Sequence, residues 1–334
     1  MAPSPLAKGS TASVRWWRGF VLVLLATLCL SLQNILVKIA QSPKPLLVMG
    51  GLLKLGGYVT PDPNNPFQVS FLVLLVRISF VVPLLWLLLP KLNPNTWSEV
   101  RYVIASSDRY LKLRIVTAGF LLFLSQTSIY LAINRVGPAT AVTLFFIYPT
   151  VTMLLAWKLF GERPVWQQWV AITLIYTGCV WLAFGASHTG FKTDAFGLLA
   201  AVASGVVFAL EGVIAQSCFS RVNPATFTGM VFTIEWLVLL VVTLPFIHVS
   251  LNGGLLLLGG LLGCATLSGY LFNNFGIQVI GAAATAIIGS SGSAVTALLG
   301  VVFLSDALNL TQWSAILLVT IGVVLMNVTR LKKA

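Results

Sequence analysis

The chain has 334 residues, of which 58% are hydrophobic and only 8% are charged, and its mean hydropathy is +0.96. Soluble domains carry about 25% charged residues, so this composition excludes a soluble globular enzyme, a disordered chain and a disulfide scaffold. The formal net charge of +12 does not indicate nucleic-acid binding, because the basic residues stand between apolar runs and form no patch. What remains is a multi-pass protein with the lipid bilayer as its main solvent.

Residues that carry metal or nucleophilic chemistry are few and scattered. No two of the four cysteines have the C-x-x-C spacing of metal and redox motifs, and both histidines fall near the ends of apolar segments. The residues in question are Cys29, Cys179, Cys218, Cys264, His188 and His248. We therefore expect no enzyme, no metal site and no cofactor.

Ten apolar segments are each long enough to cross a hydrocarbon core of ~30 Å as a helix of ~20 residues. They are continuous, whereas membrane strands alternate, so the sequence predicts an all-α integral membrane protein. The predicted spans are 17–40, 68–90, 113–135, 138–160, 165–186, 194–217, 224–247, 253–279, 281–304 and 310–330.

The distribution of lysine and arginine predicts the orientation. With both termini in the cytoplasm, fourteen of these residues lie on the cytoplasmic side and five on the other, as the positive-inside rule requires. Residues 1–16 then form a cytoplasmic tail and 331–334 a basic one. Residues 41–67, rich in proline and glycine, predict an irregular external loop, and 91–112 a short amphipathic piece on the cytoplasmic surface.

An internal repeat is visible when the chain is shifted against itself by 144 residues. The shift aligns spans 3–5 with spans 8–10 and pairs Gly119 with Gly263, Gly178 with Gly322, and Gln168-Trp169 with Gln312-Trp313. The sequence thus predicts two five-helix halves, 17–186 and 194–330, and the second must be inverted because five is odd. Inverted repeats are typical of secondary transporters, whose site lies near the midplane; the alternative is a duplicated scaffold without transport.

Several segments resemble the EamA-type permeases of the drug/metabolite transporter superfamily. The resemblance is carried by Tyr148-Pro149 with the following "TVTMLLAWKLFGERPVWQQWVAITLIYTGCVWL", by "LSLQNILVKIA" ending span 1, and by "FLVLLVRISFVVPLL" in span 2. It covers nearly the whole chain and both halves, and departs mainly in the longer 41–67 loop. The resemblance implies ten helices, cytoplasmic termini and movement of small metabolites.

Three ionisable residues stand out inside predicted spans, away from the span ends: Arg77, Glu211 and Glu235. Each costs about 2.5–3.5 kcal/mol on insertion scales, so such groups pair or line a cavity. Our interpretation is that Arg77 holds a substrate carboxylate while a glutamate accepts an amine or a coupling proton. The alternative is a structural ion pair between Arg77 and a glutamate.

A second candidate group follows from the repeat. Gln126 and Tyr130 are four residues apart and share a helix face, and their images at the 144-residue offset are Tyr270 and Asn274. These side chains could recognise a neutral or zwitterionic solute between the halves. Hydrogen bonding between packed helices is the alternative.

Helix interruptions at matched positions are the third signal. Tyr148-Pro149 in span 4 aligns with Gly292-Ser293 in span 9, within the stretch Gly289–Ser293 that also holds Ser290. Matched interruptions in two halves point to a transporter binding site, which makes Tyr148, Ser290 and Ser293 candidates. A kink or tight packing without a ligand is the alternative.

We therefore expect a secondary transporter that moves small polar metabolites, first of all amino acids or related zwitterions, by alternating access, with proton-coupled export as a hypothesis. An organic phosphate or nucleotide-sugar antiporter of the same superfamily ranks lower, since it would need several Lys or Arg. A non-transporting membrane scaffold is the alternative of another class. The expected location is the bacterial inner membrane, ahead of a plastid envelope; the expected partners are a small-molecule substrate and lipid, and a homodimer is left open.

Overall fold

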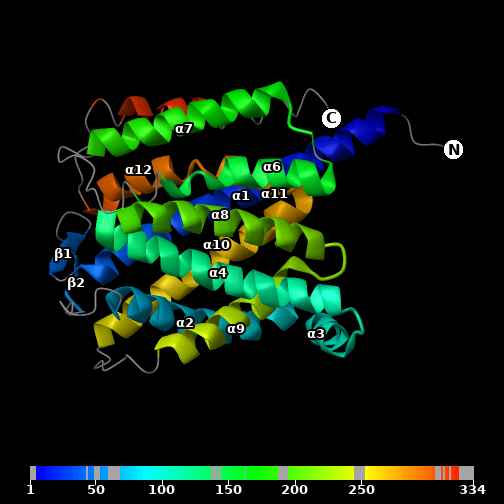
Figure 1. Cartoon of the computed structure of the whole chain (residues 1–334), viewed down its shortest axis with the longest axis horizontal. Helices are drawn as coiled ribbons and strands as arrows, with labels where there is room; N and C mark the ends of the chain where they lie inside the picture. Colours follow the sequence, from blue (N-terminus) through cyan, green and yellow to red (C-terminus); the bar gives the residue numbers. More distant parts are fainter. Residues whose placement is uncertain are drawn as a thin grey trace.

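Long helices that run side by side make up most of the computed structural model (Figure 1). The structure describes residues 5–42, 44–48, 53–58, 68–136, 141, 144–161, 163–186, 195–243, 253–304, 310, 313–315 and 317–322. Its elements are α1 (Pro5–Gln41), β1 (Pro45–Val48), β2 (Leu53–Gly56), α2 (Gln68–Leu92), α3 (Thr96–Ala105), α4 (Arg109–Val136), α6 (Tyr148–Phe160), α7 (Trp166–Ala186), α8 (Ala195–Cys218), α9 (Pro224–Thr243), α10 (Gly253–Ile280), α11 (Ala282–Gly289) and α12 (Gly292–Leu304). A further helical segment lies at Trp313–Gly322.

Seven of these helical segments are long and apolar enough to cross a membrane, within the residues that the structure describes. They are α1, α2, α4, α8, α9, α10, and α11 with α12 together. This nearly all-helical architecture fits the expected all-α membrane protein. The segments α6, α7 and Trp313–Gly322 lie within the other three predicted spans, so the ten-span topology stays a prediction.

The segments outside the spans differ in part from expectation. Helix α1 begins at Pro5 and so extends through most of the predicted tail. The loop 41–67 is not wholly irregular, because β1 and β2 pair antiparallel, Pro45 opposite Gly56 and Val48 opposite Leu53. Two short apolar runs suffice for this pairing, although the prolines and glycines around them dominate the composition. In the stretch 91–112 the expected short piece is confirmed as helix α3, which lies across the end of the bundle (Figure 1).

Two helix pairs form the largest contacts of the bundle: α1 packs along α10, and α4 packs along α8. Helix α2 packs on α9. In addition, α2 contacts α10, and α9 contacts α4. Two glycines allow the latter approaches. A Cβ on Gly119 would come within 2.6 Å of Ile234, and one on Gly263 within 2.9 Å of Phe80, which is closer than real Cβ contacts and therefore leaves room for hydrogen only.

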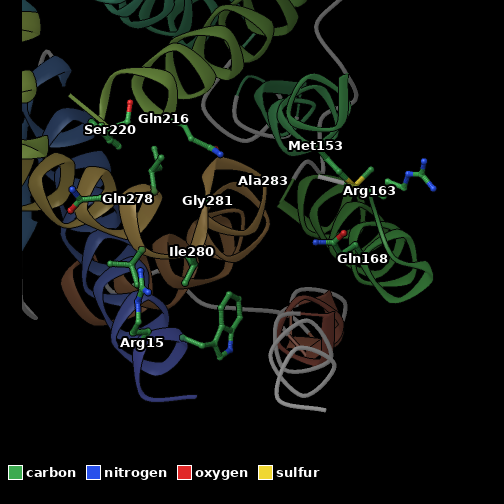
Figure 2. Close-up of a pocket in the computed structure, with 14 residues that line it drawn as sticks. Arg15, Met153, Arg163, Gln168, Gln216, Ser220, Gln278, Ile280, Gly281 and Ala283 are labelled. Atoms are coloured by element: carbon green, nitrogen blue, oxygen red, sulfur yellow. The ribbon is translucent and has the colours of Figure 1, made fainter. Parts of the chain in front are cut away.

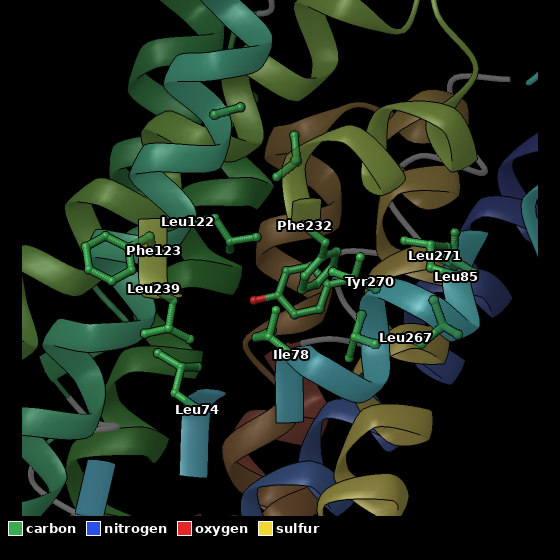
Figure 3. Packing of buried hydrophobic residues seen from close by; sticks show 14 of the residues in the cluster. Leu74, Ile78, Leu85, Leu122, Phe123, Phe232, Leu239, Leu267, Tyr270 and Leu271 are labelled. Atoms are coloured by element: carbon green, nitrogen blue, oxygen red, sulfur yellow. The ribbon is translucent and has the colours of Figure 1, made fainter. Parts of the chain in front are cut away.

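Helices α2, α4, α9 and α10 enclose the main apolar cluster (Figure 3). Its members include Leu74, Ile78, Leu122, Phe232 and Tyr270. Large apolar side chains are also exposed on the outer surface of the helices, such as Leu87 at 74% and Val241 at 75%. Those outward side chains are suited to hydrocarbon, which is the solvent that the composition requires.

Candidate functional site

Arg77, in the middle of α2, is fully buried within this apolar cluster. Its guanidinium is held by two neutral groups on one face of α4. Nη1 donates a hydrogen bond of 3.0 Å to the hydroxyl of Tyr130, and Nη2 donates one of 2.7 Å to Oε1 of Gln126. The guanidinium carbon also lies 5.6 Å from the centre of the Tyr130 ring. The predicted shared face of Gln126 and Tyr130 is therefore occupied by Arg77.

Gln126 extends this network to the second half of the chain. Its Nε2 donates a hydrogen bond of 2.8 Å to the hydroxyl of Tyr270 on α10. The Tyr270 ring meets Phe232 edge to face, with 5.0 Å between ring centres, and its hydroxyl points toward the side of the cluster where Leu122 and Leu239 lie (Figure 3). Residues 126 and 270 are 144 positions apart, so this bond joins a residue to its own image in the repeat.

Asn274, the image of Tyr130, lies outside the network. Its Nδ2 donates a hydrogen bond of 2.8 Å to the hydroxyl of Thr228 on α9, which in turn donates one of 2.6 Å to the carbonyl of Pro224. The structure thus brings Gln126, Tyr130 and Tyr270 together with Arg77, and it places Asn274 elsewhere.

Glu235 on α9 is fully buried, and neither of its carboxylate oxygens has a hydrogen-bond partner. Nε of Arg77 is likewise buried without a partner. The charges of Arg77 and Glu235 interact, as do those of Glu235 and the buried Glu211 on α8. No ion pair within 4.0 Å joins Arg77 to either glutamate, all three being described. The direct ion pair considered from the sequence is therefore not formed.

Two tryptophans join α2 and α9 beside Glu235. The indole of Trp86 on α2 donates to the hydroxyl of Thr233 on α9 at 2.9 Å, and the indole of Trp236 on α9 donates to that of Ser79 on α2 at 3.1 Å. Burying a carboxylate without hydrogen-bond donors destabilises the folded state. A proton or a donor group of a ligand would supply the partner that Glu235 lacks.

The expected helix interruptions are confirmed at matched positions. A turn at residues 146–147 precedes α6, and a turn at 290–291 separates α11 from α12. The two turns are again 144 positions apart. Within the described residues, a turn therefore stands at the same position of the 144-residue offset both before α6 and before α12.

Hydrogen bonds within the bundle tie these breaks to their neighbours. The hydroxyl of Tyr148 donates to the carbonyl of Ala286 at 3.0 Å, that of Ser290 donates to the carbonyl of Ile287 at 2.6 Å, and that of Ser31 on α1 donates to the carbonyl of Gly292 at 3.0 Å. The hydrogen bond of Tyr148 thus joins α6 to α11, and that of Ser290 stays at the end of α11. Ser293 lies in α12, and its side chain falls outside the described part of the structure.

A pocket of about 790 Å³ opens at the end of the bundle where α1 begins, here called the N-terminal end (Figure 2). Sequence analysis missed it, because its walls come from six separate segments and none of the ten candidate residues lines it. The only signal was a set of polar residues near the ends of spans. It is lined by Arg15, Trp16, Met153, Arg163, Gln168, Gln216, Phe219, Ser220, Ile277, Gln278, Val279, Ile280, Gly281 and Ala283.

No group of three His, Cys, Asp or Glu side chains is placed to hold a metal ion among the residues that the structure describes. The chemistry available is therefore that of one cation, two carboxyl groups, two phenols and several amides. Such groups bind and release solutes and protons.

Comparisons with known proteins agree with this architecture. The EamA-like transporter family matches residues 58–184 and again 195–328. A Synechocystis protein named an uncharacterized transporter is 34% identical over 321 residues, which cover 92% of this chain and 93% of the relative. A second protein named an uncharacterized transporter, YwfM of Bacillus subtilis, is 26% identical over 183 residues, or 54% of this chain and 60% of that one.

A solved crystal structure superposes on 96% of this chain and 97% of its own with a TM-score of 0.63 and 18% identity, which shows a shared fold. Two family matches together span most of the sequence. The chain therefore belongs to the EamA-like transporter family, and it is a membrane transporter of the drug/metabolite superfamily.

Proposed function

We propose that this member of the EamA-like transporter family exports small zwitterionic metabolites, amino acids or related compounds, by alternating access. The observation that carries the proposal is the arrangement of Arg77 and Glu235. Both are fully buried, their charges interact, and each keeps polar atoms without a hydrogen-bond partner. A zwitterion supplies a carboxylate for the first and an ammonium group for the second.

The neutral partners of Arg77 favour this role. Tyr130 and Gln126 orient the guanidinium without neutralising it, since neither the hydroxyl nor the amide carries a charge. The cation stays available to an anionic group that enters the core. Glu235 and Glu211 are close enough for their charges to interact, so a proton or an ammonium group shared between them would relieve the repulsion.

Ten spans in two inverted halves belong to the same proposal, and the packing supports them. Under the repeat α1 corresponds to α8 and α4 to α10, so the contact of α1 with α10 is the image of the contact of α8 with α4. A finer correspondence lies at the edge of the bundle. A Cβ on Gly178 would meet Ala315 and Val319, and a Cβ on Gly322 would meet their images Ala171 and Ile175.

The related alternative, a phosphate-bearing substrate, fits less well. A phosphate with two negative charges favours several cationic donors, whereas Arg77 is the one Lys or Arg that is fully buried among the described residues. A scaffold without transport would have no need for buried polar groups that lack partners, because each of them destabilises the folded state.

The test compares culture-medium metabolites from cells that overproduce the native protein with those from cells that overproduce Glu235→Gln at matched membrane levels. We expect a zwitterionic solute to be enriched in the medium with the native protein, and this enrichment to fall about tenfold or more in the variant. A loss of that size corresponds to the roughly 1–3 kcal/mol that an unpaired buried polar group costs. The control is Glu99→Gln, the same change on α3, where the carboxylate accepts a backbone hydrogen bond at the bundle end.

Two outcomes would contradict the proposal. Identical media from native and empty-vector cells would exclude export, and full enrichment with Glu235→Gln would exclude the glutamate from the mechanism. Proton coupling is tested in proteoliposomes: if Glu235→Gln and Glu211→Gln, singly and together, leave the pH dependence of transport unchanged, these residues carry no coupling proton.

A further inference from the structure

The pocket at the N-terminal end of the bundle has two arginines in its wall. Arg15 of α1 and Arg163, between α6 and α7, line it, and none of the described residues in its wall is Asp or Glu. Guanidinium groups only donate hydrogen bonds and carry a permanent positive charge. The pocket therefore favours an anionic group.

Two glutamines in the wall are held by the backbone. Oε1 of Gln168 accepts a hydrogen bond of 3.0 Å from the backbone N–H of Val165, and Oε1 of Gln216 accepts one of 2.6 Å from the N–H of Ala282. Since a backbone N–H can only donate, the accepting atom of each amide must be its oxygen. The NH₂ group of Gln168 is therefore left to donate, and Figure 2 shows its nitrogen on the side of the pocket.

The rest of the wall is apolar. Trp16, Met153, Phe219, Ile277 and Ile280 surround the polar groups. A volume of about 790 Å³ lies within the range of small-molecule sites, roughly 300–1,000 Å³. The pocket is thus shaped for a ligand with an acceptor-rich anionic end and an apolar body.

Two helices that line the pocket also carry residues of the buried polar groups around Arg77. On α8, Gln216 is five residues from Glu211, and on α10, Ile277 is seven residues from Tyr270. At ~1.5 Å per residue these separations are about 8 Å and 10 Å along the axis. A ligand in the pocket therefore lies about two helical turns from the network around Arg77.

From these features we infer that the pocket is a second binding site, which takes an organic anion, a carboxylate or a phosphate attached to an apolar body. The inference rests on the proposed function only where it places the pocket on the path of the substrate. Arg15 and Arg163 attract the anionic group, the amide of Gln168 orients it, and the apolar wall receives the body. A soluble metabolite and a lipid headgroup both have this chemistry.

Accessibility of a single cysteine tests the site without knowledge of the natural ligand. Ser220→Cys, in the pocket wall, is introduced into a protein whose four cysteines are replaced by alanine, and its rate of modification by a maleimide is measured in nanodiscs of phosphatidylcholine. The probes are N-acetylleucine, an anion with an apolar body, and leucine amide, its cationic counterpart. We expect the anion to slow modification and the cation to leave the rate unchanged.

The arginines decide the specificity. Because Arg15 and Arg163 are exposed at their outer ends, Arg15→Gln combined with Arg163→Gln should weaken protection by the anion about fivefold. Arg18→Gln is the matched control, since Arg18 is exposed on α1 and does not line the pocket. Equal protection by both probes, protection by neither, or equal losses with Arg15/Arg163 and Arg18 variants would overturn the inference.

A second arm identifies the source of the anion. If phosphatidylglycerol in the nanodiscs slows modification on its own, and this effect needs Arg15 and Arg163, a lipid headgroup occupies the site; if only N-acetylleucine acts, the ligand is soluble. Both results support an anion site. The measurement is paired with the metabolite comparison for the protein that keeps Glu235, so that protection by the anion without export contradicts the proposed function alone, and export without protection contradicts this inference alone.

Discussion

Replacing Gln126 by leucine removes the link between the two halves of the polar network while keeping the side-chain size. The change deletes the acceptor of Arg77 Nη2 at 2.7 Å and the donor to the Tyr270 hydroxyl at 2.8 Å. A hydrogen bond to a charged group contributes about 1.5–3 kcal/mol, and an interhelical bond between neutral groups in a membrane protein about 0.6 kcal/mol. We expect the free energy of unfolding to fall by about 2–3.5 kcal/mol.

The assay is reversible unfolding in mixed detergent micelles, followed by tryptophan fluorescence. Gln68→Leu is the control, because Gln68 lies at the start of α2 and is only partly buried; we expect it to change stability by less than about 0.5 kcal/mol. A double-mutant cycle with Tyr270→Phe should return a coupling energy of about 0.6 kcal/mol for the Gln126–Tyr270 pair. If Gln126→Leu and Gln68→Leu unfold at the same detergent fraction, Gln126 does not hold Arg77 and the network is assigned wrongly.

Two other predictions concern packing and pH. Gly178→Ala and Gly322→Ala should each lower the free energy of unfolding by about 1–3 kcal/mol, because the added Cβ would lie 2.6 Å from Val319 in the first and 2.8 Å from Ile175 in the second. Gly212→Ala is the control: its Cβ would have no atom within 4 Å, so the change should stabilise the helix by up to about 1 kcal/mol. Thermal unfolding that ranks the three variants in another order would refute the packing of α7 on Trp313–Gly322. The backbone N–H of Leu111, together with Arg221 and the N–H of Tyr110, lowers the pKa of Asp108 below its ordinary value of 3.8, so its contribution to stability is present above that value and is lost as the pH falls through the lowered one. Asp108→Asn keeps the cap but not the titration, so between about pH 4 and pH 2 the native protein should lose more stability than the variant, and parallel stability curves would contradict this.

Sequence reasoning located the buried polar residues along the chain but did not predict the contacts between them. It identified Arg77, Gln126, Tyr130 and Tyr270 as polar residues inside spans, and the repeat offset of 144 related Gln126 to Tyr270. It did not show that these two residues bond to each other, nor that Arg77 is held by α4 instead of by a glutamate. Those contacts depend on how each helix is rotated about its axis.

Asn274 illustrates the limit of the repeat. Its sequence image, Tyr130, bonds to Arg77, whereas Asn274 bonds to Thr228. A shared offset fixes the position of a residue on its helix but not the neighbour that faces it, because α2 and α9 carry different residues where they meet α4 and α10. The same limit concealed the pocket, since its arginines and glutamines come from segments that no local pattern connects.

The sequence by itself determined the membrane environment, the helical architecture, the matched helix breaks and the family. Hydropathy and the placement of proline and glycine can be read within one segment, and the repeat can be read at one fixed offset, so none of them depends on how the helices pack. The tertiary structure alone decided which polar groups meet. Glycines such as Gly119 and Gly263 set how closely the helices cross. The placement of whole helices, which no single segment reveals, leaves Glu235 without a hydrogen-bond partner and brings the pocket-lining residues together at the N-terminal end.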